Sequence, residues 1–150
     1  MVYFNMMEFF NSQTAREMRI ANMASTWLEQ REVEQNLETL VRKVLDPLRM
    51  DMGYPIQINS GYRCPALNTA IGGAKNSQHM KGMAADITLI STGKCIWNSK
   101  HLNIDAFEYI RDNFTFDQLI IYGMGNDMGR FIHVSYNPSR ENRKQTLNLK

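Results

Sequence analysis

Two histidines and one aspartate have the residue types and the order of a zinc site. His79 and Asp86 are seven residues apart with Gly82 between them, and His133 lies far downstream. Catalytic zinc is typically held by three such nitrogen and oxygen ligands, with water at the fourth position. A positively charged centre of this kind would lower the pKa of the bound water and polarise a carbonyl group. The pattern therefore indicates a metal hydrolase.

Each of the three residues also has an ordinary structural interpretation. His79 is compatible with an exposed loop residue, and His133, between two aliphatic residues, with a histidine of the core or of an edge strand. Asp86 is harder to explain in this way, because an ionised carboxylate in an apolar strand is unfavourable unless it is paired or bound to metal. From spacing alone both interpretations stay open. The third histidine, His101, follows a lysine in a polar stretch, and we expect it to be exposed.

The apolar pattern predicts a single domain over residues 1–150 with helices and strands in alternation. A short apolar element at 3–12 comes first. The main elements then follow as a helix over 29–51 with a bend near Asp46-Pro47, a strand over 56–60, a helix over 66–71, a strand over 83–89, a helix over 104–113, and a closing hairpin of 116–122 with 130–136. This order predicts an α+β fold with an antiparallel sheet and flanking helices.

Composition excludes several classes of protein. The chain has 150 residues, 43% of them hydrophobic, with a formal net charge of +2, and its basic excess lies in a tail that we expect to be solvated. This charge is too small for a nucleic-acid-binding protein, although it suits contact with an anionic polymer. The basic residues of this tail are Arg140, Arg143, Lys144 and Lys150. We also expect the protein to be a monomer.

Cysteine content and the N-terminus bear on the compartment. Cys64 and Cys95 form no metal-binding pair, and two reduced thiols are favoured over a disulfide, which stays open. The first residues include the acidic Glu8 and lack the basic and continuous apolar regions of a signal peptide. No run approaches the ~20 apolar residues of a membrane span. We therefore expect cytoplasmic synthesis without a signal peptide and without membrane insertion. An extracellular target would be reached after lysis or by a separate export route.

Two segments closely resemble the M15 peptidases, in particular the M15A-type domain. Residues 60–68 read SGYRCPALN, residues 72–86 read GGAKNSQHMKGMAAD, and the segments 116–120 and 131–136 resemble the closing strand pair of that family. Its members are zinc D-Ala-D-Ala carboxypeptidases and phage or bacterial peptidoglycan endopeptidases. The resemblance runs from about Glu8 to the tail. It implies a hedgehog/DD-peptidase-like fold, Zn²⁺ as cofactor, and His79, Asp86 and His133 as its ligands.

The same resemblance assigns roles to three further residues. Arg63 matches the arginine that holds the carboxylate or carbonyl of the substrate, a task that suits a planar bidentate donor. Its structural alternative is an ion pair with a nearby acid. Ser77 and Gln78 would orient the metal loop or contact substrate, although Ser77 is also compatible with a turn cap.

The general base is where the sequence departs from the family pattern. The family commonly places an acid three residues before the last zinc histidine, and here that residue is Arg130, which cannot accept a proton. Asp127, six residues before His133, is our predicted base, although it is equally compatible with a turn residue. Asp117 is a second candidate.

The resemblance therefore implies hydrolysis of peptide bonds in peptidoglycan stem peptides or crosslinks, with Asp127 and Arg63 as catalytic residues. The chain resembles a phage or prophage lytic enzyme, an endolysin, that meets the cell wall after membrane failure. Two alternatives stay open. One is a weak or inactive module that binds wall peptides, which the arginine at position 130 allows, and the other is a structural component of a phage particle. The bond that is cut and the host wall stay open as well.

Overall fold

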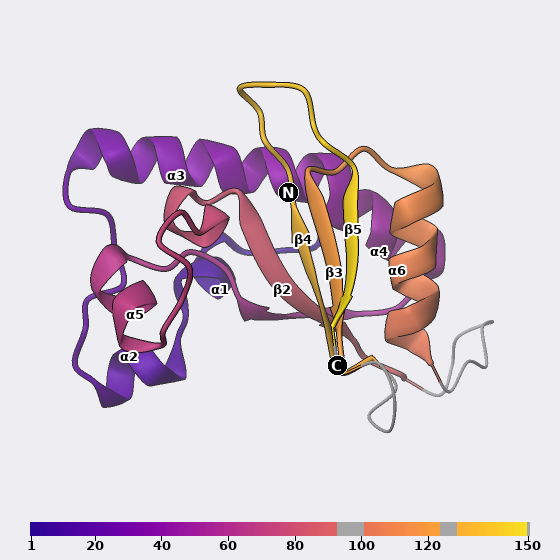
Figure 1. Ribbon diagram of the computed structural model, residues 1–150, viewed down its shortest axis with the longest axis horizontal. Coiled ribbons are helices and arrows are strands. Elements are labelled where there is room, and N and C mark those ends of the chain that lie inside the picture. Colours follow the sequence, from indigo (N-terminus) through magenta and orange to yellow (C-terminus); the bar gives the residue numbers. More distant parts are fainter. Residues whose placement is uncertain (93–100, 124–128, 150) are drawn as a thin grey trace.

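The computed structural model describes residues 1–92, 101–123 and 129–149, and Figure 1 traces the chain through them. The helices are α1 (Met6–Phe10), α2 (Gln13–Glu17), α3 (Trp27–Leu40), the π-helix η1 (Val41–Leu45), α4 (Asp46–Met52), α5 (Pro65–Ala70), the 3₁₀ helix η2 (Gln78–Lys81) and α6 (Leu102–Asn113). The strands are β1 (Ile56–Ser60), β2 (Ala84–Leu89), β3 (Gln118–Tyr122), β4 (Phe131–Ser135) and β5 (Gln145–Leu149).

The long helical run from α3 to α4 confirms the predicted main helix. At its start the Thr26 side chain accepts a hydrogen bond from the Glu29 amide, and the Glu29 side chain accepts one from the Thr26 amide. This capping box satisfies two otherwise unpaired amides. The helix widens to π geometry over η1 and continues as α4 with Pro47 in its first turn, near the predicted bend. Its apolar stripe packs into the core with fully buried side chains, namely Leu37, Leu40, Val44, Leu45 and Leu48.

The sheet confirms the α+β class. Its strand order is β1-β2-β4-β3-β5, and β1, β2, β4 and β3 pair antiparallel, as predicted. The predicted hairpin is present as β3 and β4. The fifth strand was not predicted, and it pairs parallel with β3.

The expectation of a solvated tail is wrong for its backbone. Residues 145–149 form β5, whose side chains are exposed while its backbone completes the sheet. Before it, Arg140 and Arg143 bind the buried carboxylate of Asp117. These contacts join residues more than twenty positions apart, so the composition of the tail alone did not indicate them.

The two faces of the sheet have different tasks, because side chains alternate along a strand. One face carries Ile87, Ile132 and Leu119 into the core beneath the helices, and Figure 1 shows the helical run from α3 to α4 passing behind the strands. The opposite face carries Asp86 and His133. Burial of the first face against the helices therefore fixes the register of the second.

Three smaller expectations can be compared with the structure. His101, expected to be exposed, is half-buried at the start of α6. Cys64 is a buried free thiol, and Cys95 lies outside the described residues. No helix in the described ranges has both the length and the apolar character to cross a membrane.

Candidate metal centre

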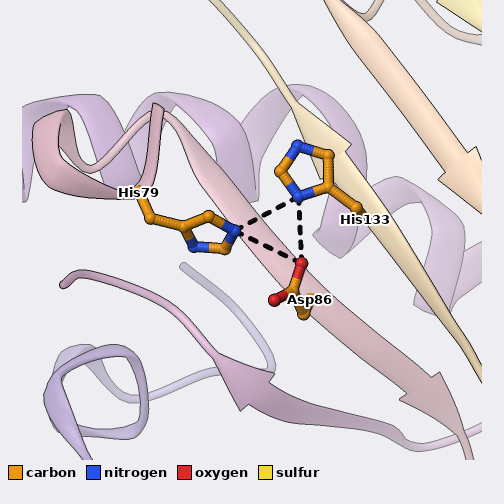
Figure 2. A group of neighbouring side chains, drawn as sticks. All are labelled: His79, Asp86 and His133. Carbon is orange, nitrogen blue, oxygen red and sulfur yellow. Dashed lines mark hydrogen bonds and ion pairs between the residues drawn. The ribbon is translucent and has the colours of Figure 1, made fainter. Parts of the chain in front are cut away.

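Three segments bring His79, Asp86 and His133 together. Asp86 on β2 lies directly opposite His133 on β4 in the antiparallel pair, and both side chains leave the sheet on the face away from the core. His79 comes from η2, the turn that leads into β2. Figure 2 shows the two rings and the carboxylate pointing toward one another. All three residues are at most 8% exposed.

The ligand atoms form a triangle of the size that zinc requires. His79 Nε2 lies 3.2 Å from His133 Nδ1 and 3.3 Å from Asp86 Oδ1, and His133 Nδ1 lies 2.9 Å from the same oxygen. Zinc bonds of about 2.0–2.2 Å at tetrahedral angles separate neighbouring ligand atoms by roughly 3.3 Å. Within the described part of the chain, this is the one group of His, Cys, Asp or Glu side chains so placed. The donor set and its spacing fit a zinc ion.

A backbone carbonyl fixes the tautomer of His79. Nδ1 of His79 donates to the Gly61 oxygen at 2.7 Å, which leaves the Nε2 lone pair for a metal. Gly61 has no room for a side chain, because a Cβ there would lie 2.5 Å from the Phe9 oxygen. The Tyr62 amide donates to that same oxygen at 2.7 Å. The end of α1 therefore requires the glycine of the Ser-Gly-Tyr-Arg motif.

The turn that carries His79 is held against α3. Gly82 ends η2 in the left-handed region with φ 67°, and its amide donates to the His79 oxygen. A Cβ at Gly82 would lie 2.4 Å from the Val33 oxygen of α3. Nearby, the buried Asn36 side chain of α3 donates to the Lys81 oxygen at 2.8 Å. Contacts with α3 thus position the turn that carries His79 relative to the sheet.

Arg63 holds the second oxygen of Asp86. Its Nη2 donates to Asp86 Oδ2 at 2.5 Å and its Nε to Ser60 Oγ at 2.8 Å. The buried side chain of Asn22 holds the backbone on both sides of Arg63, with bonds of 2.9 and 2.8 Å. Oδ1 of Asp86 is therefore the oxygen that faces the two histidines.

The protonation states expected at the cluster suit a metal. Burial raises the pKa of Asp86, but its contacts with the imidazole rings of His133 and His79 outweigh burial and hold that pKa well below its ordinary value. Burial lowers the pKa of His79 despite the nearby carboxylate. A carboxylate and a neutral imidazole are the forms that coordinate zinc.

The cluster lies in a cleft of about 770 Å³ with a basic rim. Among the described residues that line it, Asp86 is the single carboxylate. The cationic side chains of the lining are Arg63, Lys81, Arg140 and Arg143, and its other members include Ser77, Gln78, Tyr122, Phe131 and Asn137. The electrostatic character of this cleft suits an anionic ligand.

The predicted substrate-binding residues all line this cleft. Arg63 does so while it pairs with Asp86, so its structural alternative, the ion pair, is present in the same side chain. Gln78 donates from Nε2 to Asp117 Oδ2 at 2.9 Å, which anchors the turn beside His79. Ser77 precedes η2 but makes no side-chain cap to it. Their roles toward substrate stay predictions.

Asp127 and Asp117 were the two candidates for the general base. Asp127 lies outside the described residues. The carboxylate of Asp117 is fully buried and accepts bonds from Arg140, Arg143 and Gln78. Burial raises its pKa, but these bonds, led by those of Arg143, outweigh it and hold the pKa well below its ordinary value. Asp117 is therefore a structural acid and no candidate for proton transfer at the cleft.

Sequence reasoning missed Arg140 and Arg143 as lining residues of the cleft. The available signal was a pair of arginines three residues apart just after the closing strand. Their partner, Asp117, precedes β3 and becomes a neighbour only when the hairpin forms.

Comparison with known proteins relates the chain to a peptidase family. The sequence profile of the family described as Peptidase M15 matches residues 3–135, from before α1 to the end of β4. The zinc D-Ala-D-Ala carboxypeptidase of Streptomyces albus G is 46% identical over 52 residues. That match covers 34% of this chain and 20% of the Streptomyces protein. The matched segment therefore spans about a fifth of the length of that relative. The family match ends before the segment that carries Arg140 and Arg143.

Proposed function

The chain belongs to the Peptidase M15 family, and on this premise we propose that it is a zinc-dependent peptidase of peptidoglycan stem peptides or crosslinks. The observation that supports the proposal best is the convergence of His79 Nε2, Asp86 Oδ1 and His133 Nδ1. We propose these three atoms as the zinc ligands. A zinc ion bound there supplies a Lewis acid and a water of lowered pKa.

Arg63 would hold the substrate beside the metal ligands. Its Nη2 and Nε are used by Asp86 and Ser60, while its Nη1 donates to no acceptor in the described part of the chain. Because Arg63 also lines the cleft, Nη1 can donate to a scissile carbonyl or to a terminal carboxylate. Such a donor stabilises the negative charge that develops on the carbonyl oxygen.

The remaining predicted residues complete the proposal. Asp127 would remove a proton from the attacking water and return it to the leaving amine, which is the task of a general base. Gln78, anchored to Asp117, would keep the turn and its histidine in place, and Ser77 would contact substrate from the same turn. An endolysin-like role, with access to the wall after lysis or phage-assisted release, is the biological setting that we propose.

The direct test measures new amino groups released from purified cell walls. The zinc-loaded protein should release them, a chelator should stop the release, and zinc should restore it. His133→Ala should abolish the release, whereas His101→Ala, which removes a histidine outside the cluster, should keep it. Absence of metal-dependent release from every wall type tested would refute the enzymatic proposal.

A second candidate is a wall-peptide-binding module with little or no turnover. It is favoured by Arg130, which stands where the family commonly has its acid, and by the single carboxylate in the described lining of the cleft. Tight binding of zinc and of soluble wall peptides without any amine release would select this candidate over the peptidase.

A further inference from the structure

A buried carboxylate holds two arginines at the cleft. Asp117 is fully buried just before β3, and the arginines come from the segment between β4 and β5. Arg140 binds it with Nη1 at 2.8 Å from Oδ1 and Nη2 at 3.0 Å from Oδ2. Arg143 binds it with Nη2 at 2.7 Å from Oδ2, with Nε, and with its backbone amide. Two long side chains are thereby held in place.

This cluster has more positive charge than its acid neutralises. Asp117 carries one negative charge against two guanidinium groups, so one positive charge is left over. The side chains of Arg140 and Arg143 are 44% and 48% exposed, while their partner is fully buried. Among the described residues, Nη1 of Arg143 and Nε of Arg140 find no acceptor. The arginines therefore keep donors for a further anion.

The position of the two arginines points to substrate. Both line the cleft that contains His79 and His133. Gln78, the neighbour of His79, donates to the same Asp117, so the arginine cluster and the metal turn share an anchor. Arg63 lines the same cleft, but Asp86 and Ser60 use its Nη2 and Nε, which leaves Nη1 for a substrate oxygen beside the metal ligands. A carboxylate remote from the scissile bond would thus meet cations other than Arg63.

We propose that Arg140 and Arg143 form a carboxylate-binding subsite through which the cleft selects acidic peptides. The subsite rests on the proposed function and adds a preference in substrate class. Prior anchoring of the guanidinium groups reduces the conformational entropy that they would otherwise lose on binding. Paired, charge-assisted hydrogen bonds to a carboxylate then give both affinity and orientation.

The first experiment needs no variant. A synthetic stem pentapeptide is titrated into the protein by calorimetry, in parallel with forms in which one carboxylate at a time is amidated. Both zinc-loaded and zinc-free protein are used, because bound zinc would itself attract a carboxylate. We expect one amidated form to bind roughly tenfold more weakly than the parent peptide in both states. The form that loses affinity identifies a terminal or a side-chain carboxylate as the ligand.

Variants then locate the preference. Arg143→Gln and Arg140→Gln should each remove most of the difference between acid and amide forms, while thermal unfolding shows that the protein is folded. If one variant does not fold, the other supplies the measurement. Arg111→Gln is the matched control, because Arg111 is an exposed arginine of α6 that pairs with Asp112 and does not line the cleft. It should keep the full preference.

Three outcomes would overturn the subsite. These are equal binding of acid and all amide forms by the zinc-free protein, no detectable binding of any form, and a preference that both cleft variants retain. Failure of the subsite is distinguishable from failure of the proposed function. Metal-dependent amine release with equal binding of acid and amide refutes the subsite alone, whereas acid preference without release refutes only the enzymatic proposal.

Discussion

At the scale of single residues, the cluster shows how neighbouring groups select one coordinating atom on each ligand. Gly61 accepts from Nδ1 of His79, so Nε2 is the nitrogen that remains for an ion. Arg63 occupies Oδ2 of Asp86, so Oδ1 faces the histidines. Such outer partners are known to tune metal affinity and ligand orientation. The geometry of the candidate metal centre therefore depends on residues outside the set of candidate ligands.

The first prediction concerns Arg63→Lys. A lysine keeps the positive charge but has no planar fork, so it cannot hold Ser60, Asp86 and a substrate oxygen together. We expect zinc stoichiometry to stay near one, because the three ligands remain. The rate of wall-peptide hydrolysis should fall by roughly 10²-fold, as for loss of an oxyanion donor. Metal analysis and kinetics of the purified variant measure the two quantities.

Arg111→Lys serves as the control for this substitution, because Arg111 is exposed on α6 and pairs with the adjacent Asp112. Its activity should match that of the unchanged protein. Unchanged hydrolysis by Arg63→Lys would show that the planar guanidinium takes no part in catalysis.

At the scale of elements, the sequence predicted strands at β2 and β4, whereas the candidate ligands on them were predicted from residue types, spacing and the family resemblance. Ile87 and Ile132 bury one face, which places Asp86 and His133 together on the other. The register that makes these two residues direct partners could not be predicted from either strand alone. It depends on the hairpin and on packing under the helices, which local periodicity does not encode.

The last strand was missed for a different physical reason. Its sequence, Gln145–Leu149, places only two apolar residues, Leu147 and Leu149, on one face, and both side chains are exposed, so the apolar pattern is too short to mark a strand. It is held by backbone pairing with β3 and by the arginines that precede it. Charge pairing between positions so distant along the chain leaves no local signal. The basic tail was therefore interpreted as solvated.

The second prediction tests how α3 sets the metal turn. Gly82→Ala introduces a Cβ at φ 67°, 2.4 Å from the Val33 oxygen, so the turn must move. We expect the free energy of unfolding to fall by about 2 kcal/mol or more and zinc affinity to weaken by roughly tenfold. Denaturant unfolding and metal titration measure these changes.

Gly53→Ala is the matched control, because Gly53 ends α4 at φ 72° and a Cβ there would meet nothing within 4 Å. It should lose about 1 kcal/mol from backbone strain alone and keep its zinc affinity. Equal zinc affinity in the two glycine variants would show that the contact with α3 does not position His79.

The third prediction concerns the acid that anchors the C-terminal segment. Asp117→Asn removes the charge that binds Arg140 and Arg143, and we expect a loss of about 2 kcal/mol at neutral pH, because the arginines stay partly solvated. The folded-state pKa of Asp117 lies below the ordinary value of about 3.9, so its contribution is present above that pH. The contribution declines as the pH falls toward the folded pKa.

Denaturant unfolding of both proteins at about pH 7 and about pH 3.5 tests this sign. The difference in unfolding free energy between the unchanged protein and Asp117→Asn should be smaller at the lower pH. A difference that is constant or larger in acid would mean that the carboxylate gains nothing from its ionised form in the folded state.

At the scale of the whole molecule, the fold separates stability from chemistry. The helices α3, η1, α4 and α6 cover one face of the sheet and pack their buried apolar side chains into the core. The opposite face is left for the cleft, and its three candidate ligands come from η2, β2 and β4. An ion bound there would cross-link segments that are separate in sequence. Metal binding would therefore be coupled to the stability of the entire domain.

The last prediction follows from that coupling. A ligand that binds only the folded state stabilises it by about 2.7 kcal/mol when its free concentration is one hundred times its dissociation constant. Saturating zinc should thus raise the melting temperature by roughly 5–10 °C, and a chelator should reverse the rise. His79→Ala and His133→Ala should remain folded but show no zinc-dependent rise, because each leaves only two of the three converging ligands. An equal rise in His133→Ala, measured by thermal scans with and without zinc, would place the ion elsewhere on the molecule.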